Sequence, residues 1–267
     1  MNDILEDLSP PALVEAIEAN VFDFFAQFSQ GPGIEVHNDP ELLWLISNIA
    51  YPLFNSALRP RFTPESAEAG IEAMIAHYRF ANVPALWWTG PTTTPADLGA
   101  RLTAHGFIGG EASPGMAADL RQLNEEIATP IGFTIEKVTT TAMLRDWCRP
   151  FAVAFELPDF VIEPLITFYD PAGFGAGMAL DNYIGRLNGE PVAASSVYYG
   201  AGVAGIYNVA TAPEARRQGV GALMTLAPLR EARDAGYRAG ILHSSEMGVN
   251  VYRRLGFEEY CQVRHYV

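Results

Sequence analysis

Two arginines and two glycines in the second half of the chain have the types and spacing of an anion-binding loop. Arg216 and Arg217 precede Gly219 and Gly221, and a helical pattern covers 219–235. The first backbone N–H groups of a helix have no internal partner and lie at the positive end of its dipole, so they bind anions readily. Glycines remove the side chains that would block a close approach. The segment therefore predicts a phosphate or pyrophosphate site.

Three phosphate-binding motifs contain glycines of this kind. A P-loop requires Gly-x4-Gly-Lys-Ser/Thr, and this segment has no lysine. A dinucleotide-binding fingerprint requires a third glycine where this chain has Met224, and hairpin patterns precede the segment where a first βαβ unit would be required. The third motif is Arg/Gln-x-x-Gly-x-Gly/Ala, which Arg216, Gly219 and Gly221 match. The sequence favours this third motif.

A second motif follows further along the chain. Residues 251–257 read Val-Tyr-Arg-Arg-Leu-Gly-Phe: an apolar residue, a tyrosine, two polar residues and Leu-Gly-Phe. Together, the two motifs resemble those of the GNAT (general N-acetyltransferase) superfamily, over roughly residues 131–267. The resemblance implies an α/β (α+β) fold with a mixed, mostly antiparallel central sheet flanked by helices.

The resemblance also implies acetyl-CoA as cosubstrate. The strand before the loop would pair with its pantetheine arm, and the loop would hold its pyrophosphate through backbone N–H groups. Ser245 stands where the family often has a longer asparagine that contacts the cofactor. Tyr252 would protonate the leaving thiolate, since a phenol pKa of about 10 is close to that of a thiol. The cofactor-binding residues implied are Asn208, Val209, Ala210, Thr211, Arg216, Arg217, Gln218, Gly219, Val220, Gly221, Ala222 and Ser245.

The reaction implied is direct attack of a primary amine, on a small molecule or a peptide, on the thioester. The amine must lose a proton, so a base or water is required. The candidates are Glu156, Asp159, His243, Ser244, Glu246 and water, and their spacing does not select one. No His/Cys/Asp cluster has metal-ligand spacing, so no metal is expected. Two alternatives stay open: a non-catalytic acyl-CoA-binding or regulatory module with this fold, and an unrelated α/β domain whose glycines serve packing.

The elements around these motifs follow an order that predicts a mixed sheet with helices on its faces. Asn188-Gly189 is a strong signal for a two-residue hairpin turn. Strands are expected over 133–138, 182–187, 191–199, 203–210, 239–244 and 258–266, and helices over 140–154, 161–168, 219–235 and 246–255.

The first half of the chain repeats part of this order. Residues 53–57 can be laid on 206–210, and both are followed by a helical pattern, an apolar strand and a helix that closes in Gly-Phe. In the first half these elements are 65–80, 85–89 and 95–104, with further helical patterns at 11–28 and near 40–50. Residues 61–66, with acidic Glu65, replace the glycine loop. We therefore expect two tandem units, a degenerate GNAT-like domain over 1–125 and a GNAT domain over 131–267, joined by a linker at 121–131.

Composition limits the partners and the location. The 267 residues carry a formal charge of −14, which repels phosphate backbones and argues against nucleic acid as a partner. Two cysteines cannot make a disulfide framework or a four-thiolate metal site. The acidic first residues lack the pattern of a secretion signal, and no segment has the apolar length of a membrane span. We expect a cytoplasmic monomer or homodimer that does not bind membranes.

Overall fold

The computed structural model describes residues 4–31, 33–170 and 178–267. The chain forms two compact units: unit 1 is Met1–Asn20 with Gly115–Tyr260, and unit 2 is Val21–Pro114 with Cys261–Val267. Neither unit is one continuous stretch, so these units differ from the expected domains 1–125 and 131–267. Within the described ranges, no helix has the combination of length and apolar character needed to cross a membrane.

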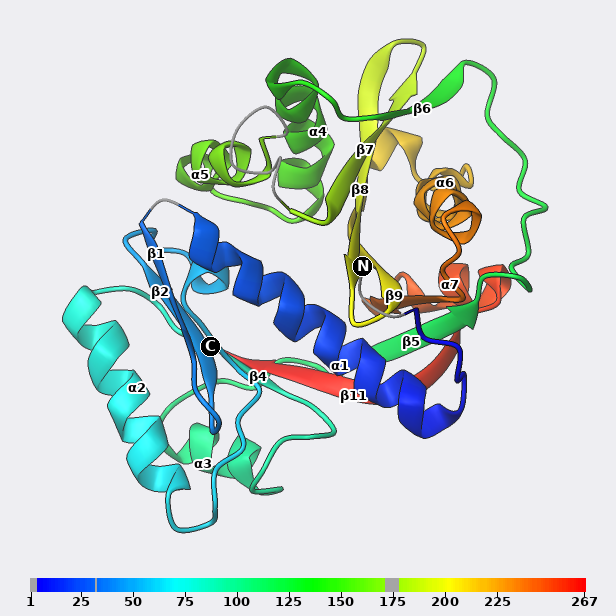
Figure 1. Cartoon of the computed structure of the whole chain (residues 1–267). Coiled ribbons are helices and arrows are strands. Elements are labelled where there is room, and N and C mark those ends of the chain that lie inside the picture. The colour runs from blue at the N-terminus through cyan, green and yellow to red at the C-terminus, as the bar shows by residue number, and fades with distance from the viewer. Residues whose placement is uncertain (1–3, 32, 171–177) are drawn as a thin grey trace. The chain divides into compact units, whose positions relative to one another are not determined.

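Unit 1 holds the two motifs (Figure 1). Its strands run in the order β5-β10-β9-β8-β7-β6, and neighbours are antiparallel except β9 and β10, which are parallel. The expected hairpin is present, because Asn188 and Gly189 both have positive φ between β7 and β8. The expected order of elements from 133 onward is confirmed. The elements are the first part of α1 (Pro10–Ala26), β5 (Ser113–Asp119), β6 (Phe133–Lys137), α4 (Thr141–Ala154), α5 (Asp159–Tyr169), β7 (Leu180–Leu187), β8 (Glu190–Gly200), β9 (Val203–Thr211), α6 (Val220–Asp234), β10 (Ala239–His243), α7 (Val249–Leu255) and the start of β11 (Glu258–Tyr266).

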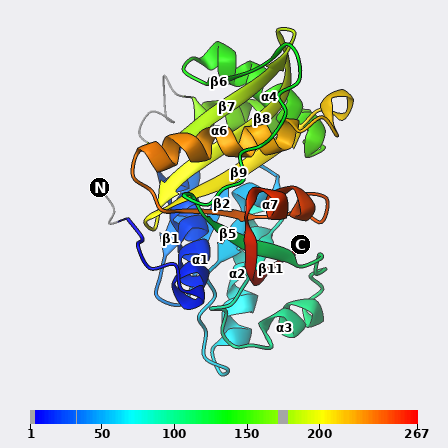
Figure 2. The ribbon, with the colours of Figure 1, turned by 90° about the vertical axis from the view of Figure 1, so that its right-hand side faces the viewer.

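Helices cover both faces of the unit 1 sheet. α4 and α6 lie on opposite sides of β7, β8 and β9 (Figures 1 and 2). Two buried hydrogen bonds fix them to the same strand: Trp147 Nε1 of α4 donates to the Ser195 carbonyl at 3.0 Å, and Ser195 Oγ donates to the Met224 carbonyl of α6 at 2.8 Å. Because both bonds are shielded from water, they hold α6 at a defined place on the sheet.

Unit 2 has a smaller sheet, and its strands run in the order β1-β2-β3-β4-β11. The helical pattern expected near 40–50 is wrong, since Leu43–Ser47 is strand β2. It pairs with β1 and β3, and alternate residues are buried, so pairing on both edges overrides the local pattern. The elements are the end of α1, β1 (Ile34–Asn38), β2 (Leu43–Ser47), β3 (Ser56–Leu58), α2 (Ala67–Ala81), β4 (Leu86–Thr89), α3 (Leu98–Ala104) and the end of β11.

The two units repeat one arrangement of strands and helices. β3, α2 and β4 correspond to β9, α6 and β10, and in both sets the two strands are parallel. Each set continues into a helix of seven residues, α3 or α7, followed by a left-handed glycine, Gly106 or Gly256. The last strands are exchanged, because β5 pairs with β10 in unit 1 and β11 pairs with β4 in unit 2. This exchange is the reason why the compact units do not follow the expected boundaries.

Candidate cofactor site

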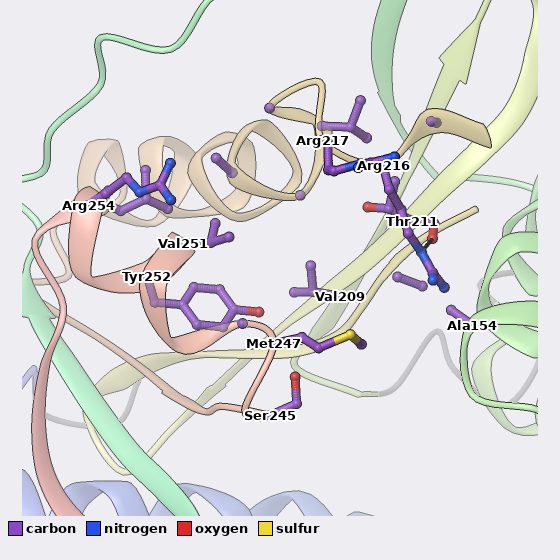
Figure 3. Close-up of a pocket in the computed structure, with 18 of the residues that line it drawn as sticks. Ala154, Val209, Thr211, Arg216, Arg217, Ser245, Met247, Val251, Tyr252 and Arg254 are labelled. Atoms are coloured by element: carbon purple, nitrogen blue, oxygen red, sulfur yellow. Dashed lines mark hydrogen bonds between the residues drawn. The ribbon is translucent and has the colours of Figure 1, made fainter. Parts of the chain in front are cut away.

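A cavity of about 770 Å³ opens in unit 1 beside the end of β9, the start of α6 and α7 (Figure 3). Eleven of the thirteen site residues expected from the sequence line it. They are Val209, Ala210, Thr211, Arg216, Arg217, Gly219, Val220, Gly221, Ala222, Ser245 and Tyr252. The fold therefore brings the glycine loop and the tyrosine motif to one cavity, although about thirty residues separate them in the sequence.

The loop between β9 and α6 leaves the first turn of the helix bare. Gly219 has a φ of +81°, a left-handed conformation that glycine adopts without the strain other residues suffer, and α6 begins at the next residue. Glycine has no side chain with which to cap the first N–H groups of the helix. A Cβ atom built on Gly221 would meet only Thr211 Oγ1, at 3.6 Å. The loop is held to β9 because Arg216 Nε donates to the Thr211 carbonyl at 3.1 Å.

Tyr252 lies on α7 with its hydroxyl directed toward β9 at Val209 (Figure 3). Its ring packs edge-on against Phe257, with centroids 6.0 Å apart. Burial raises the pKa of Tyr252 to about 12, and a hydrogen bond with Thr225 partly offsets that rise. The phenol therefore stays neutral, and able to donate a proton, throughout the neutral pH range.

Two of the expected residues do not line the cavity. Asn208 has a left-handed φ of +56°, and its Nδ2 donates to Ser196 Oγ at 3.1 Å; Ser196 in turn donates to Asn182 Oδ1 at 2.6 Å. Its side chain is thus engaged with β7 and β8, beside the irregularity in the β8–β9 pairing. Gln218 donates to the Glu214 carbonyl at 3.1 Å, so its side chain stabilises the loop itself.

Several lining residues were missed by the sequence reasoning. Arg254 lies one residue before the Leu-Gly-Phe of the second motif, and the positive charge of this segment was the signal that could have found it. Met247 and Phe155 are half-exposed or more, and they give the cavity an apolar rim. Ile127 comes from the stretch expected to be a linker, and its sequence context gives no sign of a binding role.

The arginines at this cavity are free of carboxylates. Most arginines of unit 1 are paired; Arg230 and Arg233, for example, both bind Glu125. Among the described residues, Arg216, Arg217 and Arg254 make no ion pair, and all three line the cavity. In a chain of net charge −14, unpaired cations gathered at one cavity make that cavity suited to an anionic ligand.

The candidate bases do not lie in the cavity wall. In the part of the chain that the structure describes, Glu156, Asp159, His243, Ser244 and Glu246 are all absent from the lining residues. Glu156, Asp159 and Glu246 are exposed, whereas Ser244 is buried and donates to the Ser245 carbonyl at 2.8 Å. The described residues contain no group of three or more His, Cys, Asp or Glu side chains arranged to hold a metal ion.

Comparison with known proteins identifies the fold. A family model described as an acetyltransferase (GNAT) domain matches residues 200–260, which include both motifs. The comparison with curated proteins gave no match. A GCN5-related N-acetyltransferase from Kribbella flavida has a TM-score of 0.70 and 20% identity, over 94% of this chain and 95% of that one. One from Sphaerobacter thermophilus has a TM-score of 0.62 and 15% identity, over 100% and 94% of the two chains.

A third solved structure relates to the repeat. A tandem GNAT protein from the clavulanic acid biosynthesis pathway has a TM-score of 0.57 and 15% identity, and the match covers 98% of this chain and 94% of that one. At these identities the likeness concerns the fold. The GNAT resemblance drawn from the two motifs is confirmed, and so is the expected fold, a mixed sheet flanked by helices with a GNAT-like arrangement in both halves of the chain.

Proposed function

We propose that this GNAT-fold protein is an N-acyltransferase that uses acetyl-CoA and acts on a primary amine of a small molecule or a peptide. The observation that carries the proposal is the single cavity in which the bare start of α6, three unpaired arginines and the Tyr252 hydroxyl meet. The open N–H groups at the start of α6 suit a diphosphate, and the arginines suit its negative charge. The Tyr252 hydroxyl can donate a proton to a thiolate leaving group.

The chain's residues fit such a donor. Gly219 and Gly221 leave main-chain N–H groups open for close approach, and Arg217 and Arg254 have guanidinium groups that no other described side chain engages. At about 770 Å³ the cavity is within the usual range for sites that bind small molecules and cofactors. Acetyl-CoA would supply the activated acyl group as a thioester.

Tyr252 is the proposed general acid. As the amine nitrogen bonds to the acyl carbon, the carbon–sulfur bond breaks, and the thiolate takes the phenolic proton. The nitrogen then gives up one proton to water to become an amide, and the Tyr252 phenolate regains a proton from water. A neutral phenol is the form required, and the raised pKa of Tyr252, about 12, keeps it in that form. A positioned general acid typically contributes about 100-fold or more to the rate.

The amine must reach the thioester as a free base, since a protonated amine has no lone pair. Because the candidate side chains do not line the described wall of the cavity, we assign the loss of that proton to water. The reaction rate should then follow the fraction of acceptor that is unprotonated, with an apparent pKa set by the acceptor itself.

The test is release of free CoA thiol from acetyl-CoA with a panel of primary amines, for the wild type and Tyr252→Phe. We expect the substitution to lower kcat about 100-fold while calorimetry shows nearly unchanged CoA affinity. The control is Tyr260→Phe, which removes the hydroxyl of a tyrosine outside the cavity and should leave kcat unchanged.

Two results would overturn the proposal in different ways. Tight acetyl-CoA binding without turnover of any amine would indicate a non-catalytic acyl-CoA-binding module. Absence of acetyl-CoA binding in calorimetry would mean that the glycines of this loop serve packing alone.

A further inference from the structure

The segment expected to be a linker is fastened to the two helices that frame the cavity. Residues 124–128, here called the strap, follow β5 and run beside α6 and α7 (Figure 1). Glu125 accepts hydrogen bonds from Arg230 at 2.7 Å and from Arg233 at 2.5 Å, both on α6. Asn124 bonds to the last residues of α7, with its backbone N–H donating to the Leu255 carbonyl at 3.1 Å. A flexible connection between two domains would not need such anchors.

The strap also reaches the loop that opens α6. Ile127 is half-buried and lines the cavity. A Cβ atom placed on Gly219 would lie 3.2 Å from Ile127 Cγ2 and 3.5 Å from the Ala128 carbonyl, so the strap lies beside Gly219. The anchors at Glu125 and Asn124 therefore set the position of an apolar side chain at the start of α6.

We propose that the strap is a wall of the acyl-CoA site, with Ile127 contacting the adenosine-diphosphate end of the bound donor and Glu125 and Asn124 acting as positioning residues. This inference rests on the proposed function, because it takes the donor as the occupant of the cavity. On this proposal, the strap, which connects the two repeated halves of the chain, takes part in binding the cofactor.

The position of Ile127 in the cavity indicates that it contacts the adenosine-diphosphate end of the donor. Ile127 lies beside Gly219, whose neighbouring N–H groups would hold the diphosphate, whereas Tyr252 lies at a different part of the cavity with its hydroxyl toward Val209 (Figure 3). An isoleucine side chain offers no hydrogen bond, so it suits the apolar face of a nucleoside better than the phosphates. The Glu125 carboxylate is paired with two arginines, which reduces its repulsion of an anionic ligand.

Calorimetry with CoA and its two halves tests the assignment. The probes are CoA, ADP and pantetheine, and the variants are Ile127→Ala and Glu125→Gln. We expect Ile127→Ala to weaken binding of CoA and ADP by about 5-fold and to leave pantetheine binding within about 2-fold, since three apolar carbon atoms are lost from one end of the site. Glu125→Gln should show the same pattern with a smaller factor, because it loosens the strap without changing Ile127.

The matched control is Glu190→Gln, which makes the same change of charge at an exposed position outside the strap and the cavity and should bind all three probes like the wild type. Equal CoA affinity in the wild type and Ile127→Ala would refute the strap's role and leave the proposed function intact. An equal loss for ADP and pantetheine would also refute it, because it would indicate a general structural effect. A wild type that fails to bind CoA would instead overturn the proposed function, on which the inference depends.

Discussion

Gly221 allows folding and cofactor binding to be separated by one substitution. It is the second residue of α6, and a side chain there would have room in the ligand-free protein, because its Cβ would meet only Thr211 Oγ1 at 3.6 Å. Replacing a helical glycine gains up to about 1 kcal/mol of helix propensity, and an acidic side chain in the first turn gains roughly 0.5 kcal/mol from the helix dipole. Gly221→Glu should therefore fold at least as stably as the wild type.

The same substitution should abolish most of the affinity for CoA. A carboxylate roughly 6 Å from one charge of a bound diphosphate repels that charge, which raises the free energy of the complex by about 3 kcal/mol at an effective dielectric constant of about 20. That energy corresponds to a loss of affinity of roughly 100-fold at low salt, and it should shrink as salt screens the charges. Gly221→Gln has the same size without the charge, so the difference between the two variants isolates the electrostatic part.

The assays are calorimetry with CoA at two salt concentrations and urea unfolding of the ligand-free proteins. Gly221→Ala serves as the permissive control, since the family motif admits alanine at this position, and it should bind CoA nearly as the wild type does. A stably folded Gly221→Glu that binds CoA within about 2-fold of the wild type would show that no diphosphate approaches the start of α6.

Three further results are expected. Arg254→Ala should weaken CoA binding about 10-fold in calorimetry at low salt, while Arg121→Ala, which removes an arginine outside the cavity, should not. The rate profile of kcat should show no falling limb from Tyr252 until roughly pH 11, because burial raises the pKa of this phenol to about 12 and the neutral form is the donor. The hydrogen bond from Arg233 lowers the pKa of Glu125 below its ordinary 4.5, so this pair stabilises the fold above that pH, and the contribution is lost as the pH falls through the lowered pKa. Urea unfolding at acidic pH should therefore show a smaller loss of stability for Glu125→Gln than for the wild type.

Local sequence patterns were sufficient to predict most helices and strands of unit 1. The turn at Asn188-Gly189 and the helix start after Gly219 depend on backbone conformations that few residues adopt, so their positions can be read from residue types alone. The exchange of β5 and β11 could not be found in this way. It depends on which strand each edge of a sheet accepts, and the short segment Ser113–Asp119, with its proline and glycine, has a weak strand pattern.

The candidate site likewise contains residues that the sequence could identify and residues that it could not. Motif residues such as Gly219 and Tyr252 could be found because the proposed function depends directly on their residue types. Ile127 could not be assigned, since its place in the cavity wall arises from the packing of the strap and its residue type does not indicate it. For Arg254, only the positive charge of its segment gave a signal. Asn208 was expected to touch the cofactor, whereas in the structure its side chain is engaged by Ser196.

The first copy shows in atomic terms how such a site is lost. Where unit 1 has a bare helix start, unit 2 has Thr63, whose carbonyl accepts from the N–H of Ala67 and whose hydroxyl accepts from the N–H of Ser66 at 3.1 Å. The preceding Phe62 is buried and packs tightly against Gly70 of α2. An anion would therefore find two N–H groups already bonded and an aromatic ring beside them. The same arrangement of strands and helices thus begins its helix with open N–H groups after Gly219 in unit 1, and with N–H groups bonded to Thr63 in unit 2.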